Sequence, residues 1–66
     1  MTTEVRRLQV VLNLRRRERL LADGWLGPLT DAALRRLQLD HRLPVTGLPD
    51  PATLAALGVR SDANAP

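Results

Sequence analysis

Apolar residues recur at helical spacing in three separate stretches of the chain. The first stretch has them at intervals of three and four, at Val5, Leu8, Val11 and Leu12. Residues with this spacing lie on one face of a helix, so the pattern predicts a helix from about residue 3 to about residue 15. Gln9 and Asn13 are expected to point away from its buried face.

The second and third helices are marked by their ends as well as by their apolar positions. Gly27 and Pro28 have the pattern of an N-cap followed by proline at the first helical position, and Asp50 and Pro51 have it again. We therefore expect helices over about 28–41 and 51–57, with Asp50 accepting a hydrogen bond from the backbone of the third. Their buried faces are expected to consist of Ala33, Leu34, Leu37, Leu54 and Leu57.

The turn and helix start around residue 24 occur a second time, 23 positions later. When the segment 46–57 is aligned under 23–34, six of the twelve positions are identical. Gly24 aligns with Gly47, and each glycine supplies the positive φ that a tight turn requires. The chain thus contains two turn-plus-helix repeats, and this self-similarity is evidence about the architecture of the fold before it is evidence about function.

Composition agrees with a small helical domain. The chain has 66 residues, 44% of them hydrophobic, and these include one Trp but no Phe, Tyr or Cys. The lack of alternating β-branched and aromatic residues argues against a sheet, and the lack of Cys excludes disulfides and thiolate metal sites. We predict an all-α, compact three-helix bundle over residues 1–59, followed by a disordered tail at 60–66.

The two repeats also carry the motif of a known family. Its pattern has Asp-Gly, a variable residue, Phe-Gly-Pro, another variable residue and Thr, then an aromatic-Gln pair, Gly-Leu, Thr-Gly and Asp with Thr three residues on. The matching positions are Asp23, Gly24, Gly27, Pro28, Thr30, Ala33, Gln38, Leu43, Gly47, Asp50, Thr53 and Leu57, with Leu8-Gln9 and Leu12-Asn13 in the first helix. The chain resembles the peptidoglycan-binding-like domain over nearly all of residues 5–58.

This resemblance implies a non-catalytic binding module that recognises the stem peptide or glycan of bacterial cell wall and localises a partner or a fused enzyme. The expected surface is the turn from Asp23 to Thr30, where N–H groups at the start of a helix can receive carboxylates. The candidate ligand-binding residues are Asp23, Gly24, Trp25, Gly27, Thr30, Arg35 and Gln38.

Three features depart from the family pattern. Leu26 stands where the family has Phe and is expected to be the buried anchor, while Trp25 either points outward or folds over the first helix. The run from Arg15 to Arg19 replaces a Gly-containing loop; it is either a solvated surface or an anion-binding patch, and it can extend the first helix. Leu20 and Leu21 are then expected to return the chain to the core.

Other classes of function are disfavoured by the residues. The chain has one His and no spacing of His, Asp and Glu typical of a metal site, and no nucleophile with a base, so we expect neither an enzyme nor a cofactor. A helix-turn-helix DNA reader would present the helix at 51–57, which lacks Arg, Lys, Asn and Gln. The net charge of +3 therefore indicates at most weak attraction to phosphates.

The location and the partner remain open at this level. No apolar run reaches the length of a membrane span, and the N-terminus has no signal peptide, so the expected location is the cell envelope if the domain is fused or delivered, and otherwise the cytoplasm. The alternative to wall binding is a protein–protein adaptor with the same fold, for example in a phage-like or injection assembly. Either would act as a monomer or within a larger assembly.

Overall fold

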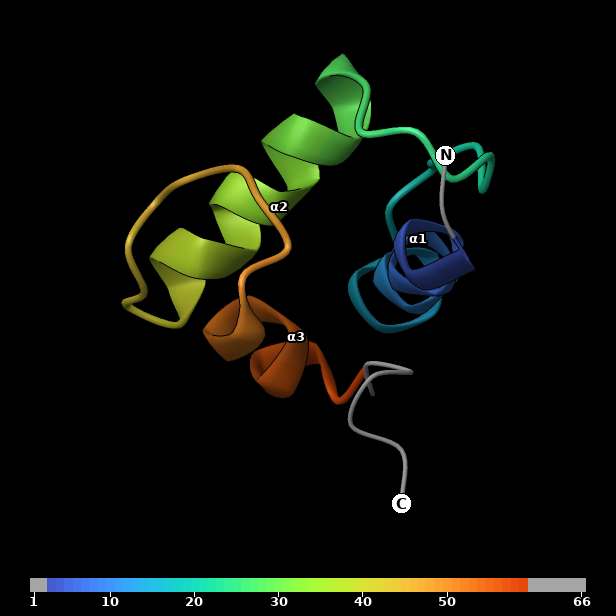
Figure 1. Ribbon diagram of the computed structural model, residues 1–66. Coiled ribbons are helices and arrows are strands. Elements are labelled where there is room, and N and C mark those ends of the chain that lie inside the picture. Colours follow the sequence, from blue (N-terminus) through green and yellow to red (C-terminus); the bar gives the residue numbers. More distant parts are fainter. Residues whose placement is uncertain (1–2, 60–66) are drawn as a thin grey trace.

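The structure, a computed structural model, describes residues 3–59, which form three helices and no strand. The helices are α1 (Thr3–Arg16), α2 (Pro28–Asp40) and α3 (Pro51–Leu57). In Figure 1, α1 is seen almost end-on while α2 runs across the view, so the two helices cross steeply. The prediction of a three-helix, all-α fold is confirmed, and the tail predicted at 60–66 lies outside the described residues.

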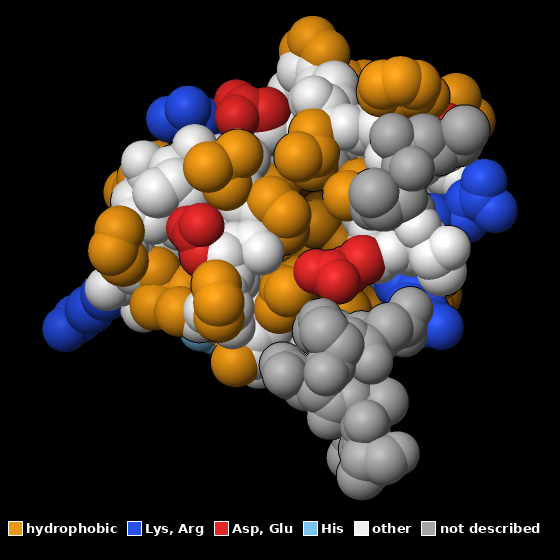
Figure 2. Space-filling model, in the orientation of Figure 1, with side chains coloured by type: hydrophobic (Ala, Val, Ile, Leu, Met, Phe, Trp, Pro, Cys, Tyr) orange, Lys and Arg blue, Asp and Glu red, His pale blue; other side chains and the backbone are white. Residues whose placement is uncertain are grey.

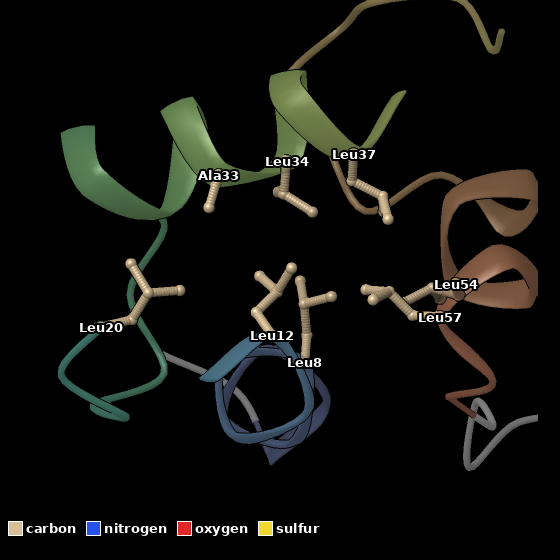
Figure 3. Close-up of a cluster of buried hydrophobic side chains, with 8 residues drawn as sticks. All are labelled: Leu8, Leu12, Leu20, Ala33, Leu34, Leu37, Leu54 and Leu57. Atoms are coloured by element: carbon tan, nitrogen blue, oxygen red, sulfur yellow. The ribbon is translucent and has the colours of Figure 1, made fainter. Parts of the chain in front are cut away.

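One apolar cluster fills the space between the helices. Figure 3 shows the leucines of α1 pointing toward α2, with those of α3 closing one end and a leucine of the first connection closing the other. The cluster is mostly leucine and contains no aromatic ring, so its stability depends on close packing of aliphatic chains. Its members are Leu8, Leu12, Leu20, Ala33, Leu34, Leu37, Leu54 and Leu57.

The first connection, loop 1 (residues 17–27), is fixed to α1 through Asn13. The amide of Asn13 donates to the carbonyl of Leu20 and accepts from its N–H, both at 2.8 Å. This pair of hydrogen bonds holds Leu20 against the core, whereas Leu21 is 78% exposed. The expectation that both leucines enter the core was therefore wrong for Leu21.

Each helix ends at a residue in the left-handed region. The φ angles are 55° at Arg17, 57° at Arg42 and 77° at Gly58. After α2 the N–H of Leu43 donates to the carbonyl of Gln38 at 2.8 Å, and that of Arg42 donates to Leu39 at 3.2 Å, which is the Schellman arrangement. This turn stops α2 before Pro44, and Arg17 stops α1 before the arginine run can extend it.

The helix starts follow the predicted pattern, with one difference. Gly27 and Asp50 are the N-caps and a proline follows each. However, the Asp50 carboxylate makes no capping bond to its own helix, because it instead accepts a hydrogen bond from the Thr46 hydroxyl at 2.6 Å. The predicted backbone cap was wrong, and Asp50 instead stabilises the turn that precedes α3 by its hydrogen bond with Thr46.

Replacing Arg42 by glycine should stabilise the fold. A side chain in the left-handed region costs roughly 1–2 kcal/mol, and part of the gain from its removal is offset by the flexibility of glycine in the unfolded chain. We expect Arg42→Gly to raise the free energy of unfolding by about 0.5–1 kcal/mol in urea titrations. Arg42→Ala removes the same charge but keeps the strain, so equal stabilities of the two variants would contradict this account.

Candidate binding site

The start of the candidate site is held in place by the buried side chain of Gln9. Its amide nitrogen donates to the Trp25 carbonyl at 2.8 Å and to the Thr30 hydroxyl at 3.1 Å, with a longer contact of 3.3 Å to Asp23. Its oxygen accepts the N–H of Gly24 at 2.9 Å. A single amide thus ties α1 to loop 1 and to the first turn of α2. The expectation that Gln9 points away from the buried face was wrong.

The second connection, loop 2 (residues 41–50), is built the same way around Gln38. The Gln38 amide nitrogen donates to the Leu48 carbonyl and the Thr53 hydroxyl, each at 3.0 Å, and to the Thr46 hydroxyl at 3.1 Å. Its oxygen accepts the N–H of Gly47 at 3.0 Å and that of Thr46 at 2.9 Å. The sequence repeat is therefore also a repeat of one hydrogen-bond network.

The correspondence extends to the turn itself. The Trp25 N–H donates to the Asp23 carboxylate at 2.9 Å, and the Leu48 N–H donates to the Thr46 hydroxyl at 3.1 Å. In both turns a short polar side chain thus caps the N–H two residues on. Trp25 and Leu48 occupy equivalent places, and both side chains are exposed.

Trp25 borders a shallow pocket of about 150 Å³ at the entrance to α2. The indole is 59% exposed, and Leu29 beside it is 69% exposed. Figure 2 shows hydrophobic side chains along the upper edge of the molecule, over the start of α2 and the loop before it. We call this the tryptophan pocket; its lining is Leu20, Leu21, Asp23, Trp25, Gly27, Pro28, Leu29 and Thr30. The outward position is the alternative that the structure supports for Trp25, and Leu26, also partly exposed, is not the buried anchor that we expected.

Five of the seven predicted site residues gather at this place. Asp23, Trp25, Gly27 and Thr30 line the tryptophan pocket, and Gly24 lies buried behind it with its N–H on Gln9. Thr30 is itself buried, so it serves the site chiefly by accepting from Gln9.

Arg35 and Gln38 lie elsewhere. Gln38 is fully buried in the loop 2 network, where its amide is already hydrogen-bonded. Arg35 pairs with Asp31 at 3.0 Å, and this pair lies against Gly47. A Cβ at Gly47 would come within 2.1 Å of the Asp31 carboxylate, so this close approach and the positive φ both require glycine.

A comparison with protein families decides what kind of domain carries this pocket. The family model of the peptidoglycan binding domain matches residues 2–57, which is most of the chain. The chain belongs to the peptidoglycan binding domain family. No curated protein and no solved structure matches it. As a peptidoglycan binding domain it is a binding module, and its three helices agree with the all-α fold of the family.

Neither a metal-ligand cluster nor a membrane-spanning helix is found in the part of this peptidoglycan binding domain that the structure describes. Within residues 3–59, no three His, Asp or Glu side chains are grouped as metal ligands. Over the same residues, no helix has both the length and the apolar character that a bilayer span requires. The one histidine, His41, is the C-cap residue of α2, and its backbone N–H donates to the carbonyl of Leu37.

Two leucines of the tryptophan pocket were missed by the sequence analysis. Leu21 was expected in the core, and no role was predicted for Leu29. The buried face of α2 is formed by Ala33, Leu34 and Leu37, and Leu29 does not belong to it. An apolar residue outside the helical repeat, next to an exposed turn, is the signal that could have identified Leu29.

Removing the Gln9 amide should loosen the whole first network. Gln9→Ala leaves the Gly24 N–H and the Trp25 carbonyl without their partner, and each buried unpaired group costs roughly 1–3 kcal/mol. We expect a loss of about 2–4 kcal/mol in the free energy of unfolding, measured by urea titration. The exposed-site control Leu14→Ala should change stability by less than about 0.5 kcal/mol; a comparable loss in both variants would contradict this role.

Asp23 should titrate below an ordinary aspartate. The hydrogen bond from the Trp25 N–H to its carboxylate lowers the pKa of Asp23 from 3.8, and the Gln9 amide and Arg6 act in the same direction. Because the folded-state pKa is the lower one, Asp23 contributes stability above pH 3.8, and this contribution is lost as the pH falls through the folded-state pKa. Asp23→Asn should lack this part of the acid destabilisation, as measured by unfolding at several pH values. An Asp23 resonance that titrates at or above 3.8 would contradict the assignment.

Proposed function

We propose that this domain binds bacterial peptidoglycan without catalysis and that the tryptophan pocket is its contact surface. The observation that carries the proposal is the exposed indole of Trp25, which lines one pocket with two exposed leucines, Leu21 and Leu29, in a chain of the peptidoglycan binding family. An exposed aromatic ring beside a hollow is a favoured contact for sugars and peptides. The indole does not belong to the core, which contains no aromatic side chain.

The geometry of loop 1 supports a preformed site. The Gln9 amide donates to the Trp25 carbonyl at 2.8 Å, and the Asp23 carboxylate accepts the Trp25 N–H. The backbone that carries the indole is therefore fixed. Because the backbone of Trp25 is already ordered, binding has only the side-chain torsions of the indole left to restrict, which favours affinity. The first turn of α2 adds N–H groups at the rim of the same pocket, because Gly27 provides no side-chain cap.

Such a module would localise whatever it is attached to. A pocket of about 150 Å³ accommodates part of a sugar ring or one amino-acid side chain rather than a whole repeating unit. Binding at one site of this size is expected to be weak, and the repetitive structure of the cell wall would raise the effective concentration of sites around a bound domain.

Retention on insoluble peptidoglycan tests this proposal. We expect the purified domain to sediment with peptidoglycan and Trp25→Ala to lower its apparent affinity by about tenfold or more, as for a central aromatic contact. The matched control is Leu48→Ala, since Leu48 holds the equivalent place in loop 2 and is similarly exposed. It should retain binding.

Two results would contradict the proposal. Equal losses in the two variants would show that the tryptophan pocket is not the contact surface. The absence of any retention would remove the wall-binding role and leave the protein adaptor, for which the exposed leucines would then be the first surface to mutate.

A further inference from the structure

A second hollow, rimmed by arginine, adjoins the tryptophan pocket. Its volume is about 310 Å³, and it lies between loop 1 and the outer side of α2. Its charged rim consists of Arg17, Glu18, Arg19 and Arg36, and we call it the arginine pocket. Leu20 and Leu29 belong to the lining of both hollows, so the two form one continuous surface.

The arginine pocket carries an excess of positive charge. Its one acid, Glu18, is paired with Arg36 at 2.7 Å. Arg17 and Arg19 are exposed, and neither forms an ion pair or a hydrogen bond within residues 3–59. The guanidinium groups of both residues are therefore available to an anion from solution.

The side chains of Arg17 and Arg19 take part in neither glutamine network. Gln38 reaches Gly47 across nine residues, whereas Gln9 makes the same bond to Gly24 across fifteen. Most of this difference lies in α1, which continues for seven residues after Gln9, whereas α2 ends two residues after Gln38. The two networks therefore do not account for the arginines at residues 17 and 19.

The segment is nevertheless held in a defined position. Asn13 fixes Leu20 to α1, and the pair between Glu18 and Arg36 fixes the loop to α2. Arg17 has a positive φ of 55°, a conformation that asparagine or glycine would adopt at lower cost. Helix termination alone therefore does not explain an arginine at this position.

We infer that the arginine pocket binds a carboxylate of the peptidoglycan stem peptide, while the adjoining part of the same ligand lies against Trp25. This inference rests on the proposed function and specifies the ligand as an acidic peptide attached to a glycan. Two unpaired arginines beside an apolar floor match a carboxylate on a short aliphatic residue, because guanidinium groups bind carboxylates in a planar, directional way. The continuous surface allows both contacts at once.

The test uses the single tryptophan of the chain as its reporter, since Trp25 lines the tryptophan pocket, which shares Leu20 and Leu29 with the arginine pocket. The probes are a muramyl tetrapeptide with free carboxylates and the same compound with those carboxylates amidated. We expect the wild-type domain to bind the free acid about three- to tenfold more tightly in fluorescence titrations, and this difference to shrink at high salt.

The variants distinguish a specific contact in the arginine pocket from the general electrostatic attraction of a basic domain for anions. Arg17→Asn keeps the left-handed conformation and removes the charge, and Arg42→Asn makes the same change at the end of α2, outside both pockets. Arg17→Asn, and likewise Arg19→Gln, should abolish the preference for the free acid, and Arg42→Asn should keep it. Thermal unfolding of each variant checks that the fold is intact.

Three outcomes would overturn the inference: equal affinity of the wild-type domain for the two probes, equal loss in Arg17→Asn and Arg42→Asn, or binding of a glycerol phosphate polymer in place of the peptide. If retention on peptidoglycan still depends on Trp25 in those cases, the proposed function stands and only the carboxylate contact fails. If retention is absent as well, both fail.

Discussion

The fold depends on two buried glutamine side chains, each of which forms the hydrogen bonds that a buried turn can no longer form with water. A tight turn packed against a helix leaves N–H and C=O groups without water, and such groups must be paired if the turn is to stay buried. Gln9 and Gln38 each offer a donor and an acceptor on one rigid amide, so one side chain satisfies both kinds of group. In a domain with no disulfide and a core of leucine and alanine, these networks give each loop one conformation.

The two networks also separate scaffold from function. α2 serves both of them, since Thr30 in its first turn accepts from Gln9 and Gln38 near its end binds loop 2. What differs between the units is therefore informative. Loop 1 has an exposed indole where loop 2 has leucine, and it carries two arginines of the arginine pocket. The stretch from Gln9 to Gly24 is also six residues longer than that from Gln38 to Gly47.

The sequence predicted the elements of the fold well, because these depend on local signals. Apolar spacing and the Gly27-Pro28 and Asp50-Pro51 pairs gave helix bounds that agree with the structure to within one or two residues. The glutamines were not predicted as anchors, since a polar residue between apolar ones is usually solvated and only the folded turn shows why it is buried. The equivalence of Gln9 and Gln38 was also hidden, because the stretches between each glutamine and the turn that it binds differ in length.

The candidate site was predicted in part for the same reason. Asp23, Trp25 and Gly27 are close in sequence and share one turn, so the motif located them together. Gln38 was grouped with them because it lies near in sequence along α2, yet it belongs to the other loop. The exposure of Trp25 and Leu21 could not be predicted, since both residue types are usually buried and only the placement of Leu20 in the core turns Leu21 outward.

The left-handed C-cap at Gly58 limits the length of α3 and hence the residues that this helix can offer to a following turn. A repeat that adds one turn and one helix at a time has the logic of a solenoid, in which every helix offers an anchor for the next unit. In the 23-residue repeat, Gly58 corresponds to Arg35. The C-cap of α3 therefore lies three positions before the one that corresponds to Gln38. Within the described residues, α3 therefore presents no glutamine amide, and a further unit could not be anchored in the way that the first two are.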